Sequence, residues 1–277
     1  MIVVECFARA LIVVSLVACS VTVHARAFEV RLLEGNEQAG VWGTDEFSVA
    51  VNSQGLLRHV KVNGREIIWQ AAALYTFPIP LEESKGVRTV QGEGHGERGL
   101  TVEPSRMQTR DERGRRVFEF DHLVASKKVL GGRPLCKVGQ QVTILPTGEI
   151  NVAYECEWLE TLRWQTFQLL LMFDKGNCES RKFLAAAPDV LRVGKLDPGP
   201  RSGDVRQIRG VPFEQLTIRP EVGPVHFVWD EPSDCSFHWG TDVQLRIAPQ
   251  SLPRRTPILK GRKARISYRI LLPVLQE

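Results

Sequence analysis

The alternation of apolar and polar residues predicts β-strands along most of the chain. From Lys263 to Ile270 every second residue is apolar, and the residues between are lysine, arginine or serine. A period of two sustained over this length fits a strand with one buried face and excludes a helix. Residues 47–51 repeat the pattern on a shorter scale. Both faces of residues 167–173 are apolar, which predicts a strand in the middle of a two-layer core.

Turn residues separate these strands at short intervals. Asn63-Gly64 is the strongest hairpin signal, because a type I′ turn needs positive φ at both central positions. Asp111–Gly114 and Pro146–Gly148 mark two further hairpins. Many strands joined by polar turns predict an all-β fold, a single large sandwich of two antiparallel sheets that runs from residue 28 to residue 277.

The first 27 residues have the three parts of a secretory signal peptide. Arg9 precedes an uncharged, mostly apolar run of 14 residues, and Ala25-Arg26-Ala27 puts small residues where a signal peptidase cuts. The run is too short to span a bilayer comfortably. Leu16-Val17-Ala18-Cys19 also resembles the lipobox of bacterial lipoproteins, in which residues 1–18 are removed and Cys19 carries a lipid anchor. Both alternatives predict a mature chain that is exported to the periplasm, the envelope or the medium and has no transmembrane span.

Charge and cysteine content narrow the range of partners. The formal net charge of +4 in 277 residues is too small to indicate a nucleic-acid-binding protein. No cysteine pair has CxxC spacing and no histidine follows at zinc-finger distance, so neither a metal ion nor another cofactor is predicted. An even number of cysteines in an exported chain favours at least one disulfide, with its connectivity open, although some of them alternatively serve as small buried residues. With Cys6 and Cys19 removed in the signal peptide, the four that are left are Cys136, Cys156, Cys178 and Cys235.

Three segments carry a resemblance to a known fold. Residues 55–66 place a strand between a glycine turn and the Asn63-Gly64 turn, residues 142–152 form a central hairpin, and residues 264–272 close the chain with an amphipathic strand. This pattern resembles the galactose mutarotase-like β-supersandwich, which implies a sugar-handling fold over most of the mature chain. The epimerases of that superfamily use a His and a Glu on inner strands, each inside a local motif. Neither motif occurs here, so the resemblance assigns no catalytic residue.

Residues 226–242 hold the densest collection of side chains able to carry sugar chemistry. Indole rings stack on the C–H faces of sugars, and imidazoles and carboxylates bond to sugar hydroxyls or move protons. We therefore predict that Trp229 and Trp239 bind the ligand. The candidate catalytic residues of this segment are His226, Asp230, Glu231 and His238. In the alternative interpretation, residues 230–234 form an exposed turn and both indoles belong to the core.

A second cluster of candidates surrounds Glu155 and Glu157. On a strand these two carboxylates share one face, opposite Cys156 and Trp158. That arrangement suits either the lining of a groove or a solvated face, and the solvated face is the favoured interpretation.

Three classes of function stay open. The first two are an exported enzyme that acts on carbohydrate and a non-catalytic domain that binds it, with a glycan or small sugar as the partner. The third is a structural or interaction module of the bacterial cell envelope. An enzyme needs two titratable groups that converge in a cleft, a binding domain needs an aromatic platform, and an envelope module needs neither. The sequence does not decide whether the protein is an enzyme.

Overall fold

The computed structural model of the chain is built almost entirely from antiparallel strands. The predicted signal peptide and Cys19 lie outside the part of the chain that it describes. The described residues contain no helix long and apolar enough to cross a membrane. They are residues 29–76, 79–80, 93–94, 101–125, 134–165, 167–197, 206, 208–239, 243–252 and 256–274.

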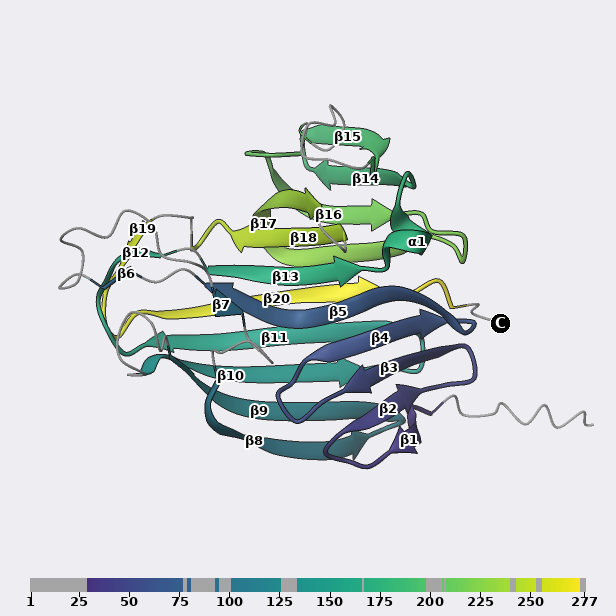
Figure 1. Cartoon of the computed structure of the whole chain (residues 1–277), viewed down its shortest axis with the longest axis horizontal. Coiled ribbons are helices and arrows are strands. Elements are labelled where there is room, and N and C mark those ends of the chain that lie inside the picture. The colour runs from purple at the N-terminus through teal and green to yellow at the C-terminus, as the bar shows by residue number, and fades with distance from the viewer. Residues whose placement is uncertain are drawn as a thin grey trace, which may run out of the picture.

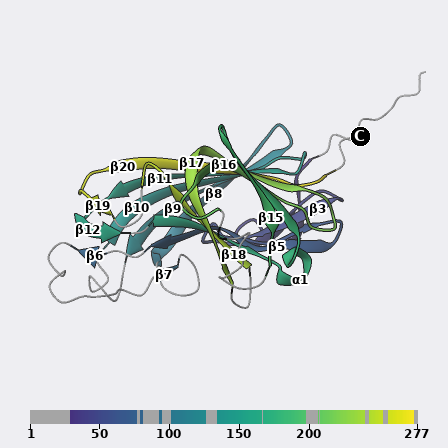
Figure 2. The ribbon, with the colours of Figure 1, turned by 90° about the horizontal axis from the view of Figure 1, so that it is seen from above.

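Two layers of strands stack on one another (Figures 1 and 2). The rear layer in Figure 1 contains, in spatial order, β8 (Thr101–Glu112), β9 (Arg115–Ala125), β10 (Pro134–Ile144), β11 (Glu149–Trp158), β20 (Lys263–Leu271), the first part of β17 (Val225–Trp239), β16 (Pro212–Ile218), β14 (Lys182–Ala187) and β15 (Val190–Lys195). The front layer contains β1 (Arg31–Gly35), β2 (Gly40–Gly43), β3 (Phe47–Val51), β4 (Leu57–Val62), β5 (Arg65–Thr76), β13 (Phe167–Phe173), β18 (Val243–Pro249) and the last part of β17. This arrangement confirms the predicted all-β sandwich.

Smaller elements lie at the ends of the sandwich. A three-stranded sheet contains β19 (Thr256–Ile258), β12 (Leu162–Gln165) and β6 (Ile79–Pro80). The short strand β7 (Glu93–Gly94) pairs with β5, and α1 (Lys175–Cys178) is a single helical turn.

The long strand β17 belongs to both layers. His226–Trp229 pairs with β20 in the rear layer, whereas Ser233–Trp239 pairs with β18 in the front layer. Between these halves, residues 229–232 of β17 lie opposite the single residue Glu214 of β16. Such a bulge bends a strand and increases its twist. The bulge therefore lets one strand leave the rear layer and enter the front layer, and it occupies the place where an exposed turn was the alternative interpretation.

The predicted hairpins form at the predicted turns. Asn63 and Gly64 have φ angles of 49° and 76°, as a type I′ turn requires, and they join β4 to β5. Asp111–Gly114 joins β8 to β9, and Pro146–Gly148 joins β10 to β11. These three connections are local, which is why the sequence alone could locate them.

Alternate residues of the strands fill the space between the layers. Burial alternates residue by residue along Glu149–Trp158 of β11, and the buried residues belong to the main core. Tyr268 of β20 reaches from the rear layer to the front layer, where its hydroxyl accepts a hydrogen bond from the backbone N–H of Ala72 in β5 at 3.0 Å. Ala72 has a φ of 58°, in the left-handed region that alanine rarely adopts. A buried polar bond thus links the two layers.

The expected disulfide is absent from the described residues, in which Cys136, Cys156, Cys178 and Cys235 are all free and buried. Cys136 and Cys156 lie on neighbouring strands but are offset by two residues in register, because Cys136 faces Trp158 and Cys156 faces Val138. The neighbouring Cys136 thiol and burial both raise the pKa of Cys156, so this sulfur stays protonated. The four residues serve as small buried side chains, which was the alternative interpretation.

Candidate functional site

The two histidines predicted as catalytic candidates lie near opposite ends of β17. They are separated by most of the 15 residues of the strand. Because a strand rises about 3.3 Å per residue, they would be roughly 40 Å apart if β17 were straight. His226 bonds through Nδ1 to the Thr217 hydroxyl at 2.8 Å, and burial, with a smaller contribution from Arg219, lowers the pKa of His226. His238 lies 3.3 Å from the Ser236 hydroxyl through Nε2.

The two carboxylate candidates contact different parts of the fold. Asp230 accepts a hydrogen bond from the Ser267 hydroxyl of β20. Glu231 accepts bonds from the hydroxyl and the backbone N–H of Ser251, which follows β18, at 2.6 and 3.2 Å. Although Asp230 and Glu231 are adjacent in sequence, the β17 bulge sends them to separate partners. The structure therefore does not bring the four candidates together as an acid–base pair.

The indole of Trp229 belongs to the main core. Its side chain is 4 % exposed, so neither ring face is available for stacking on a sugar in this structure. The reason is its place in the rear half of β17, where alternate residues point between the layers. The backbone of Trp239 pairs with Val243 of β18. The side chain of Trp239 lies outside the described part of the structure.

A row of side chains crosses five strands on the outer face of the front layer, and His238 is one of its members. The strand register places these residues side by side: Arg58 faces Gln70, Gln70 faces Met172, Met172 faces Gln244, and Gln244 faces His238. We call these five residues the cross-strand row. With strands about 4.8 Å apart, the row is roughly 20 Å long.

A second line of residues runs beside the cross-strand row. Leu170 of β13 faces Arg246 of β18, and Arg246 faces Ser236 of β17. The Arg246 guanidinium donates a hydrogen bond to the Gln244 side-chain oxygen at 3.3 Å, which connects the two lines. The guanidinium of Arg58 lies over the ring of Trp69, 5.7 Å from its centre. Guanidinium, amide, imidazole and hydroxyl groups are thereby concentrated on one face.

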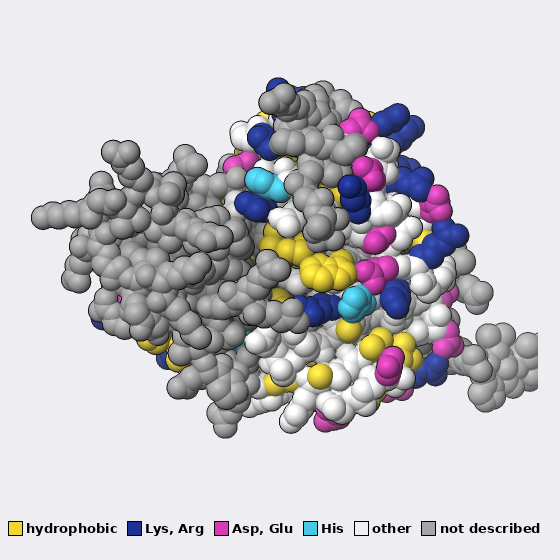
Figure 3. Space-filling model, viewed as in Figure 1, with side chains coloured by type: hydrophobic (Ala, Val, Ile, Leu, Met, Phe, Trp, Pro, Cys, Tyr) yellow, Lys and Arg dark blue, Asp and Glu magenta, His cyan; other side chains and the backbone are white. Residues whose placement is uncertain are grey.

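This face is unusual because some of its outward-pointing groups are buried. The exposed fractions of Gln70, Gln168 and Ser236 are 7, 3 and 4 %. Leu170 packs with Leu56 and Met172 in a hydrophobic cluster separate from the main core. Figure 3 shows hydrophobic side chains in the middle of this face, bordered by basic, acidic and histidine side chains. A patch of apolar side chains beside a few polar groups is one feature of a ligand site.

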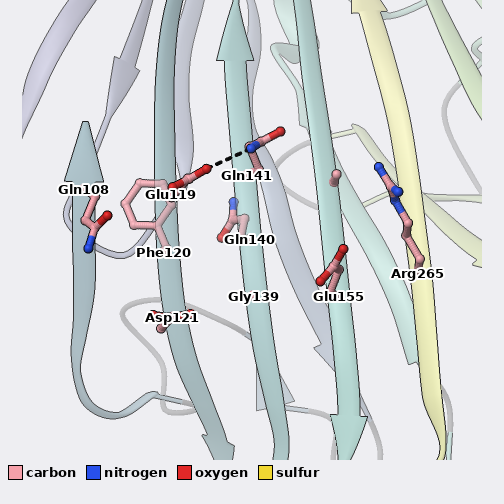
Figure 4. A pocket seen from close by; sticks show the side chains of 10 residues that line it. Gln108, Glu119, Phe120, Asp121, Gly139, Gln140, Gln141, Glu155 and Arg265 are labelled. Carbon is pink, nitrogen blue, oxygen red and sulfur yellow. Dashed lines mark hydrogen bonds between the residues drawn. The ribbon is translucent and has the colours of Figure 1, made fainter. Parts of the chain in front are cut away.

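The rear layer has a hollow of about 350 Å³ on its own outer face (Figure 4). Gly139 of β10 lies at its centre, and a Cβ there would be 3.9 Å from its nearest neighbour. Asp121 and Glu155 flank this glycine in register, and Arg265 faces Glu155 from β20. Glu155 thus lies on the exposed side of β11, as predicted.

The lining of the hollow is mostly charged or amide-bearing. Glu119 accepts hydrogen bonds from Arg110 and, at 3.0 Å, from Gln141, and these bonds lower the pKa of Glu119. Phe120 is the aromatic residue of the lining, but its side chain is 2 % exposed. Trp158, on the other side of β11, is also buried in the core. The hollow therefore offers no aromatic platform among its lining residues, in keeping with a solvated sheet face.

Comparison with known proteins identifies the fold. No protein-family model and no curated protein matches the chain. A galactose 1-epimerase from Lactobacillus acidophilus NCFM superposes with a TM-score of 0.50 and 8 % identity over 87 % of this chain and 97 % of that chain. The chain has the galactose mutarotase-like fold. At this identity the likeness shows the fold alone.

The galactose mutarotase-like fold also occurs as part of longer proteins. An α-mannosidase from Enterococcus faecalis V583 has a TM-score of 0.52 at 9 % identity, over 87 % of this chain and 30 % of that chain. The heparan sulfate lyase HepC from Pedobacter heparinus has a TM-score of 0.50 at 5 % identity, over 88 % of this chain and 36 % of that chain. This chain therefore spans about a third of these two enzymes.

Sequence reasoning found one member of the cross-strand row, His238, and missed the others. The row draws its residues from five strands, and no spacing along the chain relates Arg58 to Met172 or Gln244. One signal was present in residues 167–173, whose second apolar face was interpreted as part of a two-layer core. In this galactose mutarotase-like fold, that face instead points outward and forms the small cluster with Leu56.

Proposed function

We propose that this protein is an exported carbohydrate-binding domain and that the cross-strand row forms part of its sugar site. The observation that carries the proposal is the row itself, in which Arg58 and Gln70 on one side and Gln244 and His238 on the other flank Met172 on the outer face of the front layer. The solved structures of the same fold add support, because an epimerase, a mannosidase and a heparan sulfate lyase act on sugars.

The chemistry of the row suits a sugar ligand. A pyranose has hydroxyls around its edge and C–H groups on its faces, so it needs planar hydrogen-bonding groups beside an apolar surface. Gln244, which is half-buried, supplies amide donor and acceptor atoms, and the half-buried Arg58 supplies guanidinium donors. Met172 supplies apolar contact. None of the five residues is a carboxylate, so the row provides no pair of carboxyl groups for glycoside hydrolysis. Binding is therefore the function that it supports.

The proposal of export rests on the predicted signal peptide and does not depend on sugar binding. The uncharged run and the Ala25-Arg26-Ala27 sequence support removal of residues 1–27, with lipidation at Cys19 as the alternative. Mass spectrometry of the natural product distinguishes a start at Phe28 from a lipidated start at Cys19. A product that keeps Met1 would contradict both routes.

The binding test uses a matched pair of glutamines. A glycan array identifies a binder, and titration calorimetry with that glycan then compares Gln244→Leu in the cross-strand row with Gln141→Leu in the rear hollow. Each substitution roughly keeps the volume of the side chain and removes its amide group. Loss of a hydrogen-bonding group from a desolvated site costs about 1–3 kcal/mol, so Gln244→Leu should weaken binding by roughly 5- to 150-fold. Gln141→Leu should leave affinity unchanged.

Two results would contradict the proposal. The first is the absence of binding to any glycan on the array. The second is an equal loss of affinity in both variants, or a loss in Gln141→Leu alone, which would move the site away from the row. Circular dichroism and urea denaturation of both variants separate lost binding from lost folding.

A further inference from the structure

Exposed apolar side chains are concentrated on two strands. The described residues include five exposed large apolar side chains, and four of them lie on β1 and β15. Leu32 and Leu33 of β1 are 38 and 40 % exposed, and Leu191 and Val193 of β15 are 59 and 58 % exposed. Scattered exposed leucines need no explanation, but their concentration on particular strands indicates an interaction surface.

Strand β15 is the last strand of the rear layer. Among the described strands it pairs with β14 alone, which leaves its other side as a sheet edge. Leu191 and Val193 point to the same side of the sheet, and the exposed Arg192 lies between them. The strand ends at Lys195 and contains no acidic residue, so this edge is apolar and basic.

Strand β1 is the last strand of the front layer. Among the described strands it pairs only with β2, and all five of its residues are exposed. Arg31, the cation of this strand, forms an ion pair with Asp45, whereas the exposed Glu34 has no described ion-pair partner. This edge is therefore apolar and acidic, the complement of β15.

We propose that the β15 edge of one copy of this chain pairs with the β1 edge of the next copy. An unpaired edge presents a row of backbone N–H and C=O groups that a second strand satisfies. Leucine and valine side chains then meet across the new ladder, and Arg192 and Glu34 attract one another. Contact between two β15 edges would oppose arginine to arginine, and contact between two β1 edges would oppose glutamate to glutamate.

The positions of the two edges determine the form of the assembly. β1 and β15 lie at opposite ends of the sandwich in Figure 1. A contact between different surfaces of identical copies repeats from copy to copy, so it builds an open filament or, if the rotation closes, a ring. The cross-strand row is not part of either edge, so this proposal does not depend on sugar binding.

Charge reversal on each edge tests the proposal. Sedimentation velocity measures the assembly of three proteins over a wide range of concentration: the unchanged protein, Arg192→Glu and Glu34→Lys. Each is expressed as the full chain and used as the producing cell processes it. The unchanged protein should assemble. Each variant alone opposes like charges, which should raise the concentration needed for half-assembly by roughly 2- to 30-fold. An equimolar mixture of the two variants restores opposite charges at every junction and should assemble again.

Rescue by mixing separates this contact from other causes of association. Arg192 and Glu34 are exposed, and thermal melts of each variant check that the fold is intact. A monomer at all concentrations of the unchanged protein would overturn the proposal. Assembly that persists in both single variants, or that fails to return in the mixture, would also overturn it, because another surface would then hold the copies together.

Discussion

Replacing Tyr268 by phenylalanine should destabilise the sandwich, because this hydroxyl joins its two layers. The oxygen accepts the N–H of Ala72 at 3.0 Å across the core. The side chain of Tyr268 is 1 % exposed and Ala72 is fully buried, so no water replaces the lost acceptor. Burial also raises the pKa of Tyr268 far above its ordinary value, which keeps the phenol neutral at physiological pH.

The magnitude follows from the group left behind. An unsatisfied buried backbone N–H costs about 1–3 kcal/mol. The bond also helps to hold Ala72 at a φ of 58°, a conformation that alanine otherwise avoids. For a domain of this size, a loss of about 1–3 kcal/mol lowers the melting temperature by roughly 2–12 °C. Tyr268→Phe keeps the ring, so a packing cavity contributes little to this loss.

Urea denaturation measures the effect as a lower midpoint with an unchanged slope. Tyr154→Phe is the matched control. Tyr154 is equally buried and neighbours Tyr268, but its hydroxyl does not hold the Ala72 amide. It should therefore lose less stability. An equal loss in both variants, or a loss below about 0.5 kcal/mol in Tyr268→Phe, would refute the role given to the interlayer bond.

Three further predictions concern stability. Gly55→Ala should cost more than about 1 kcal/mol in urea denaturation, because Gly55 has a φ of 75° and a Cβ there would clash with the Gln140 side-chain oxygen. Gly139→Ala should be nearly neutral, because a Cβ there would make only ordinary contacts with Glu155 at 3.9 Å. Burial lowers the pKa of His122 below its ordinary value of 6.5, so the unfolded state binds more protons and the free energy of unfolding should fall as pH drops below about 6.5. Urea midpoints measured from pH 8 to 5 check this, and the midpoint of His122→Gln should depend less steeply on pH. Trp229→Ala should cost roughly 3–5 kcal/mol and lower the soluble yield; a stable variant that has lost only glycan binding would contradict its place in the core.

The sequence determined the features that depend on near neighbours. Period-two alternation specifies which face of a strand is buried, so residues 263–270 could be assigned without a structure. Asn63-Gly64 specified its own turn, because few other residues accept positive φ at both positions. The turn-and-strand pattern also led to the galactose mutarotase-like fold, which the superposition on a solved galactose 1-epimerase supports.

Only the tertiary structure decided which side chains meet. Residues 226–239 looked like one site because their side chains are close in sequence, but an extended strand separates them and its bulge directs Asp230 and Glu231 to different partners. The cross-strand row has the opposite character, with neighbours that are far apart along the chain. Strand register and the fold of the sheet bring Arg58 and His238 onto one face, and these are set by the packing of the whole core and not by any local pattern.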